Sequence, residues 1–188
     1  MPTFYEGKPI EVVEQTISAD EYACAYYAAQ STGSLIHKRE VKAGICVTLA
    51  VITVSVIPIY LRRFFTFWGP VCTAFVLLGL AAVFFFVQPN DIKSWAEKLY
   101  HSNMLLSLPQ KISIYRDSVV VENEREQLAE YWTDFFSCIE TGDTFVFNGG
   151  RERNLLIIKK QGLSEEQRKR LSAHFFNEFA SRYHKIGR

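Results

Sequence analysis

The sequence lacks the short motifs that mark common catalytic and nucleotide-binding sites. Its 188 residues contain no G-x-x-x-x-G-K-[ST], no G-x-G-x-x-G and no H-E-x-x-H. No serine or cysteine stands with a histidine and an acid in a recognisable nucleophilic arrangement. We therefore expect a protein that is not an enzyme and that uses no cofactor.

Cysteine and histidine are too sparse for a metal site or a disulfide framework. The four cysteines are scattered along the chain, at Cys24, Cys46, Cys72 and Cys138. Two of them fall in uncharged stretches, where a thiol behaves as a small apolar group. The four histidines show no metal-ligand spacing, at His37, His101, His174 and His184. We expect neither bound metal nor a disulfide scaffold.

Excess charge of one sign is also missing. Lys and Arg number 21 against 20 Asp and Glu, and the net charge of +1 argues against a dedicated nucleic-acid binder. With 48% hydrophobic and 22% charged residues, the composition excludes wholesale disorder. The first 40 residues hold six acidic residues and no apolar core followed by a cleavage site, so we expect no signal peptide.

Two uncharged stretches, residues 43–61 and 64–90, occupy the middle of the chain, and only Arg62 and Arg63 separate them. A bilayer core about 30 Å thick requires about 20 helical residues. The first stretch has 19 residues and fits one crossing. A soluble pair of such helices needs a large apolar partner, which the rest of the chain does not supply. The sequence therefore predicts an integral membrane protein.

The second stretch is too long for one unbroken crossing. Gly69-Pro70 suits a turn followed by a helix start, since proline is tolerated in the first helical turn. Helices over 43–61 and 70–87 then form a transmembrane hairpin within residues 43–90. Aromatic and basic residues suit the bilayer interface, so we expect these residues to lie there: Tyr60, Arg62, Arg63, Phe64, Phe65, Phe67 and Trp68 in the loop, and Trp95 beyond the hairpin.

The lysines and arginines around the hairpin predict its orientation. The ends of the hairpin that lead to the two termini are flanked by five, at Lys38, Arg39, Lys42, Lys93 and Lys98, whereas the loop holds two. We therefore expect both termini in the cytoplasm. Neither predicted membrane helix has an ionisable group in its core, so the usual signature of a transporter or proton relay is lacking.

The N-terminal segment, residues 1–42, contains a predicted strand over 9–17 and an amphipathic helix from about Ala19. A capping-box pattern, Ser18-Ala-Asp-Glu21, precedes that helix. Its tyrosines offer either a docking face or, as we favour, a surface that packs on the C-terminal domain; they are Tyr22, Tyr26 and Tyr27. After the hairpin, residues 91–108 form a predicted linker helix that Pro109 ends.

Residues 109–188 change from helical to two-residue periodicity. Predicted strands cover 111–115, 119–123, 127–132, 144–149 and 154–160. A second capping box, Ser164-Glu-Glu-Gln167, then starts a helix whose apolar stripe comprises Leu171, Phe175, Phe176, Phe179 and Tyr183. The predicted fold class is α+β with membrane helices, the small antiparallel β domain being closed by a C-terminal amphipathic helix in a pleckstrin-homology-like shape.

The end of the chain is basic. Residues 151–188 contain ten basic and four acidic residues, a net charge of +6. Candidate lipid-facing or partner-facing residues are Arg168, Lys169, Arg170, Arg182 and Lys185. A cation near anionic headgroups is worth about 1 kcal/mol. The alternative is a solvated helix face paired with the acidic strands, and both interpretations stay open.

These features together resemble the YcxB-like family of small bacterial membrane proteins, over nearly the whole length. The resemblance is carried by EQTISADEYACAYY, by two adjacent apolar helices, and by ISIYRDSVVVENEREQLAEYWTDFFSCIETGDTFVFNG followed by NLLIIKKQGLSEEQRKRLSAHFF. Ile158-Lys159-Lys160 departs from it, because the family commonly has a proline at this junction. The resemblance implies a membrane protein with no assigned reaction.

Two functions fit these expectations. The first is a non-enzymatic, multi-pass protein of the bacterial cytoplasmic membrane that presents a cytoplasmic interaction or regulatory domain. The alternative is an immunity protein against a bacteriocin or secreted toxin, and a toxin gene beside this one would favour it. The expected partners are the lipid bilayer and a protein, either a toxin or another membrane protein, with no nucleic acid.

Overall fold

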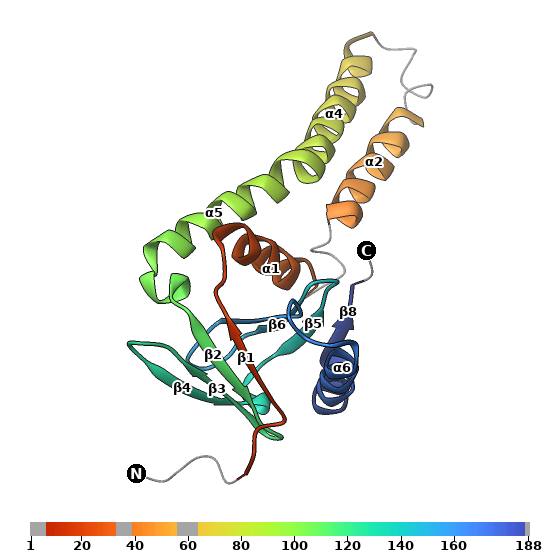
Figure 1. The fold of residues 1–188 in the computed structure, drawn as a ribbon. Coiled ribbons are helices and arrows are strands. Elements are labelled where there is room, and N and C mark those ends of the chain that lie inside the picture. The colour runs from red at the N-terminus through yellow and green to blue at the C-terminus, as the bar shows by residue number, and fades with distance from the viewer. Residues whose placement is uncertain (1–6, 33–38, 56–63, 187–188) are drawn as a thin grey trace. The chain divides into compact units, whose positions relative to one another are not determined.

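The computed structural model describes residues 7–32, 39–55 and 64–186 (Figure 1). The protein is α+β. The chain divides into two compact units. The strand unit comprises Met1–Ala29 and Trp95–Arg188, and the helix unit comprises Gln30–Ser94. Three residues of the predicted interface, Tyr60, Arg62 and Arg63, lie outside the described residues.

The strand unit contains two four-stranded sheets. The first is antiparallel in the order β1-β2-β3-β4, formed by β1 (Glu11–Gln15), β2 (Gln110–Ile114), β3 (Ser118–Glu122) and β4 (Gln127–Tyr131). The second has the order β7-β6-β5-β8, formed by β5 (Ser137–Glu140), β6 (Thr144–Asn148), β7 (Leu155–Lys159) and β8 (Tyr183–Lys185). Among the described strands, β8 is the one that pairs in parallel, with β5.

The six strands predicted from the sequence are confirmed, with ends shifted by at most two residues. Two further strands, β5 and β8, were not predicted. β5 is buried on both faces, so its residues do not alternate between apolar and polar. Tyr183 was predicted on the helical stripe, but it begins β8, because the helix ends at Phe179 and Ala180 turns the chain at φ 45°.

The N-terminal strand is part of the domain that the rest of the chain builds. β1 pairs with β2 from Glu11 opposite Ile114 to Gln15 opposite Gln110. The Gln15 side chain also reaches the second sheet, because its Nε2 donates to the Ile157 carbonyl at 2.6 Å and its Oε1 accepts from the Lys159 amide at 2.7 Å. One side chain therefore satisfies backbone groups on the edge strand β7 and joins the two sheets.

Two apolar cores lie on opposite faces of the second sheet. In β6, Phe145 and Phe147 enter one core while Val146 enters the other. The first core contains Trp132 and the buried face of α6 (Glu165–Phe179), namely Leu171, Phe175 and Phe179. The second is covered by α1 (Ala19–Thr32) and α5 (Gln88–Ser102). Burial on both faces explains the nearly continuous apolar strands.

Both predicted capping boxes are present. Ser18 and Glu21 exchange hydrogen bonds at the start of α1, as do Ser164 and Gln167 at the start of α6. The tyrosines of α1 contribute to packing, as favoured from sequence. Tyr22 is buried and Tyr26 is partly buried against the second core, where the Tyr100 hydroxyl donates to the Ile17 carbonyl at 2.6 Å.

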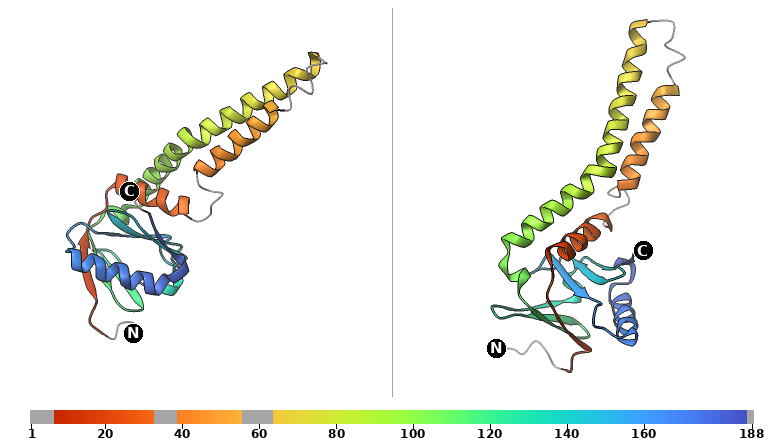
Figure 2. Two further views of the ribbon diagram at one scale, coloured as in Figure 1. Left: turned by 90° about the vertical axis from the view of Figure 1, so that its right-hand side faces the viewer. Right: turned by 45° about the horizontal axis from the view of Figure 1, so that its top comes forward.

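The helix unit contains α2 (Arg39–Ser55) packed beside α4 (Phe64–Ala82) in every view (Figures 1 and 2). The predicted loop through Gly69 and helix start at Pro70 are wrong, because α4 begins at Phe64 and Pro70 lies inside it. Phe64, Phe65, Phe67 and Trp68 are therefore helical. Proline removes one backbone donor, a loss that apolar helices tolerate through local adjustment.

A π-helical turn, η2 (Val83–Val87), joins α4 to α5 without a break. Among the described residues, the run Trp68–Ser102 is the one helix that is long and apolar enough to cross a membrane, by length and composition alone. The other predicted span, 43–61, is described only as far as Ser55. A short 3-10 turn, η3 (Met104–Ser107), then precedes Pro109.

Candidate functional site

Where burial is described on the packed helices α2 and α4, the buried side chains are all small. Cys46 and Ala50 are buried on α2, and Ala74 and Ala81 are buried on α4. Each of these four residues is at most 8% exposed. Small residues allow two helix backbones to approach closely, which favours association where no apolar core is available.

Many large apolar side chains of these helices and of the following π-helical turn η2 are exposed. Phe75 is 71% exposed and Phe86 is 68% exposed. Exposed with them are Ile45, Val47, Leu49, Val51, Ile52, Val54, Trp68, Val76, Leu78, Leu80, Val83, Phe85 and Val87. A continuous apolar surface of this kind marks a face that meets a membrane or another apolar partner.

Four hydroxyl groups on the described parts of these helices are satisfied within the helix. Each donates to the carbonyl four residues earlier at 2.8–2.9 Å, in Thr48, Thr53, Ser55 and Thr73. Back-bonding of this type lets serine and threonine stay in an apolar helix without a water partner. These four hydroxyls therefore place no unsatisfied donor on the apolar surface.

Basic residues gather where the apolar surface of the helix unit ends. The Arg39 guanidinium carbon lies 5.0 Å from the ring centroid of Phe85, and the Lys42 Nζ lies 5.7 Å from that of Phe84. Arg39 also forms an exposed ion pair with Glu40, at 2.8 Å between Nε and Oε1. This group, Arg39, Lys42, Phe84 and Phe85, is called the basic–aromatic cluster below.

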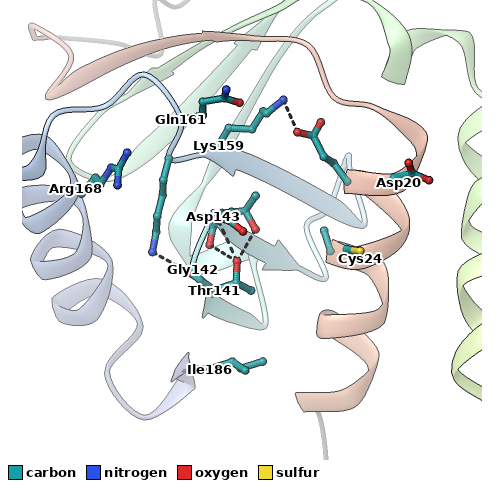
Figure 3. Close-up of a pocket in the computed structure, with 13 residues that line it drawn as sticks. Asp20, Cys24, Thr141, Gly142, Asp143, Lys159, Gln161, Arg168 and Ile186 are labelled. Carbon is teal, nitrogen blue, oxygen red and sulfur yellow. Dashed lines mark hydrogen bonds and ion pairs between the residues drawn. The ribbon is translucent and has the colours of Figure 1, made fainter. Parts of the chain in front are cut away.

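The strand unit contains an open pocket of about 680 Å³ with several charged side chains in its lining (Figure 3). Its walls come from α1, from the β5–β6 turn, from the end of β7 and from α6. The lining residues used below are Asp20, Glu21, Cys24, Thr141, Lys159, Lys160 and Arg168.

The two pocket lysines are neutralised by carboxylates. Lys159 Nζ lies 2.6 Å from Glu21 Oε1 and donates to the Thr16 carbonyl at 3.0 Å. Lys160 Nζ lies 2.8 Å from Glu140 Oε1 and donates to the Thr141 carbonyl at 2.6 Å. Burial alone would raise the pKa of Glu21, but its hydrogen bonds with Lys159 and Ser18 outweigh burial and lower that pKa.

Glu140 connects several elements behind the pocket. Its carboxylate accepts hydrogen bonds from the Tyr183 hydroxyl and from Ser172 Oγ, in addition to Lys160. Burial acts to raise the pKa of Glu140, but the bonds with Lys160 and Tyr183 together lower it. Burial and the same carboxylate raise the pKa of Tyr183. The Glu140 carboxylate, at the end of β5, therefore contacts β8, α6 and the residue after β7.

Arg168 is the cation that the pocket leaves most available. Its Nε donates to the Leu163 carbonyl at 3.1 Å, and no acceptor among the described residues meets its two terminal nitrogens. Figure 3 shows Arg168 on α6, across the pocket from Asp20 and Cys24 on α1. The lining residues combine this cation with carboxylates and the Cys24 thiol, an arrangement that suits the binding of a polar ligand.

The predicted basic residues have different surroundings. Besides Arg168, Arg182 donates to the Phe135 carbonyl at 2.7 Å and lies over Phe179, while Lys185 lies 3.5 Å from Glu140. Lys169 and Arg170 are exposed on α6. A role for these five at a lipid or protein surface stays a prediction.

Phe176, predicted on the apolar stripe of the C-terminal helix, is exposed. It is 58% exposed and packs edge-on against Tyr183 at 5.7 Å. Trp68 and Trp95 are both exposed, and the Trp95 ring lies 5.4 Å from that of Tyr26.

The sequence analysis did not identify Gln15, Glu140 and Lys160 as site residues. The one sequence feature that indicated a charged site here was the Lys159-Lys160 pair at the end of an apolar strand.

Comparison with family models, with curated proteins and with solved structures finds no significant match to this chain.

Proposed function

We propose that the protein is a non-enzymatic integral membrane protein in which α2 and α4 cross the bilayer as a hairpin. The supporting observation is the inverted side-chain distribution of these helices, which place small residues between them and large apolar residues outside. Lipid tails are as apolar as leucine, so close packing of small residues holds such helices together while bulky side chains face lipid. In water the same surface would promote aggregation.

The strand unit then serves as an interaction domain at the cytoplasmic face of a bacterial membrane. The positive residues beside the hairpin ends support this orientation. We also infer a pleckstrin-homology-like arrangement and membership of the YcxB-like family. Two sheets closed by a C-terminal helix, preceded in the chain by two adjacent apolar helices, support both inferences.

The pocket beside Arg168 is the surface of this domain that we assign to partner recognition. Arg168 supports the assignment, because a guanidinium group presents paired donors suited to carboxylate or phosphate. Lys159 and Lys160 already have carboxylate partners, so Arg168 is the cation available to an incoming anionic group.

Membrane fractionation of the full chain in bacteria tests the proposal. The protein is expected to stay in the membrane after an alkaline carbonate wash. Replacing Phe75 and Leu78 together with arginine is expected to reduce the retained fraction, because each arginine at a span centre costs about 2.5–3.5 kcal/mol of insertion free energy. Release of the wild-type chain by carbonate would contradict membrane insertion.

A matched variant controls for the general effect of exposed arginines. Phe136 and Phe176 are also exposed, at 74% and 58%, but they lie in the strand unit. Changing both to arginine is expected to leave the retained fraction unchanged. An equal loss in the two variants would point to misfolding instead of failed insertion.

A further inference from the structure

The basic–aromatic cluster lies at the boundary between charged and uncharged sequence. Lys42 is the last charged residue before the uncharged stretch of α2, and Phe84 and Phe85 lie a few residues before Asp91, the first charge after the second stretch. Both rings belong to the π-helical turn that continues α4. In a membrane hairpin this boundary is the level of the lipid phosphates.

We propose that the basic–aromatic cluster binds the phosphate of an anionic phospholipid. This inference rests on the proposed membrane insertion and names a lipid that the inserted protein binds. Arg39 and Lys42 are three residues apart on α2, a spacing that places their side chains on one face of the helix. The guanidinium group and the ammonium group then offer two sets of donors to the same phosphate.

The two phenylalanines hold these cations at the apolar boundary. Each cation lies within 6 Å of a ring centroid, the range of an attractive cation–π contact. Restricting long side chains in the free protein lowers the entropy cost of binding. The neighbouring Phe86 is 68% exposed, so an acyl chain attached to the bound phosphate meets an apolar surface directly beside the cations.

Charge complementarity selects a net anionic lipid over a zwitterionic one. Glu40 neutralises part of the charge of Arg39, whereas no carboxylate among the described residues forms an ion pair with Lys42. The three charged side chains therefore sum to +1, which complements a singly charged phosphatidylglycerol. The ammonium group of phosphatidylethanolamine adds a positive charge near the same cations and weakens that attraction.

Native mass spectrometry of the full chain tests the site. The purified protein is titrated separately with phosphatidylglycerol and with phosphatidylethanolamine of identical acyl chains. The phosphatidylglycerol complex is expected to form at lower lipid concentration, and added salt is expected to reduce that preference. Equal binding of the two lipids, or a preference that salt leaves unchanged, would overturn the proposal.

Variants locate the binding to the cluster. Lys42→Gln is expected to weaken phosphatidylglycerol binding about fivefold, with a smaller effect for Phe84→Leu, which removes the ring but keeps apolar volume. Lys111→Gln removes an exposed cation from β2 in the strand unit and is the matched control. Equal losses for Lys42→Gln and Lys111→Gln would contradict a local site.

The membrane assay separates this inference from the proposed function. A chain that resists carbonate extraction but shows no lipid preference refutes the lipid site alone. A chain that carbonate removes refutes membrane insertion, and with it the lipid site.

Discussion

Lys160 and Glu140 form a buried ion pair, with 2.8 Å between Nζ and Oε1 and with side chains that are only 8% and 7% exposed. The pair connects the residue after β7 to the end of β5. The ammonium group also lies 4.5 Å from the ring centroid of Phe145, and the carboxylate holds Tyr183 of β8. Removing Lys160 leaves Glu140 with the exposed Lys185 as its remaining cation, whereas removing Glu140 leaves Lys160 buried with no carboxylate partner among the described residues.

Replacing Lys160 with methionine is expected to lower the free energy of unfolding of the strand unit by up to about 3–5 kcal/mol, because Glu140 then keeps only the exposed Lys185 as a cation, 3.5 Å away. Denaturant unfolding of the full chain in detergent, followed by near-ultraviolet circular dichroism, measures the change. The Lys160→Met/Glu140→Gln double variant is expected to recover part of the loss. No loss in the single variant would show that the pair contributes nothing to stability.

The pH dependence of stability follows from the lowered pKa of Glu140. Since the folded-state pKa lies below the ordinary value of 4.5, the ionised carboxylate stabilises the fold above that value. This contribution is lost as pH falls through the folded-state pKa. Melting temperatures measured from about pH 6 to about pH 3 are expected to fall toward acid, and less steeply in Glu140→Gln. An identical slope in both proteins would contradict this assignment.

Phe175 and Phe176 are adjacent but have opposite environments. Phe175 is fully buried among aromatic rings, so Phe175→Ala is expected to cost about 3–5 kcal/mol of unfolding free energy. Phe176→Ala is expected to cost about 0.5–1.5 kcal/mol, the value of its single aromatic contact with Tyr183. Chemical unfolding of the two variants side by side measures the difference, and comparable losses would refute it.

Reporter fusions test the predicted topology. A reporter that is active only in the cytosol is expected to work when fused after Arg188 and to fail when inserted near Thr66, because positive residues favour cytoplasmic hairpin ends. The reverse result would invert the orientation. Opposite locations for the two termini, shown by an additional N-terminal fusion, would refute the hairpin.

The local signals in the sequence predicted most of the elements. Capping boxes and alternating patterns depend on neighbours within a few residues, and they located α1, α6 and six strands correctly. The same reasoning misplaced the start of α4, because Gly69-Pro70 is a turn signal only when the preceding residues do not continue the helix. It also included Phe176 in the apolar stripe, since helical periodicity alone does not show how wide the buried face of a helix is.

The sequence by itself determined the uncharged block, the charges that flank it, and the succession of strands that a final amphipathic helix follows. These properties depend only on residues that are close together in the chain. Only the tertiary structure decided that β1 joins a strand about a hundred residues later, that Gln15 joins two sheets, and that Lys160 meets Glu140. Such contacts depend on which distant segments pair and on which polar groups are then enclosed. A buried charge or amide is stable only where folding brings a partner to it.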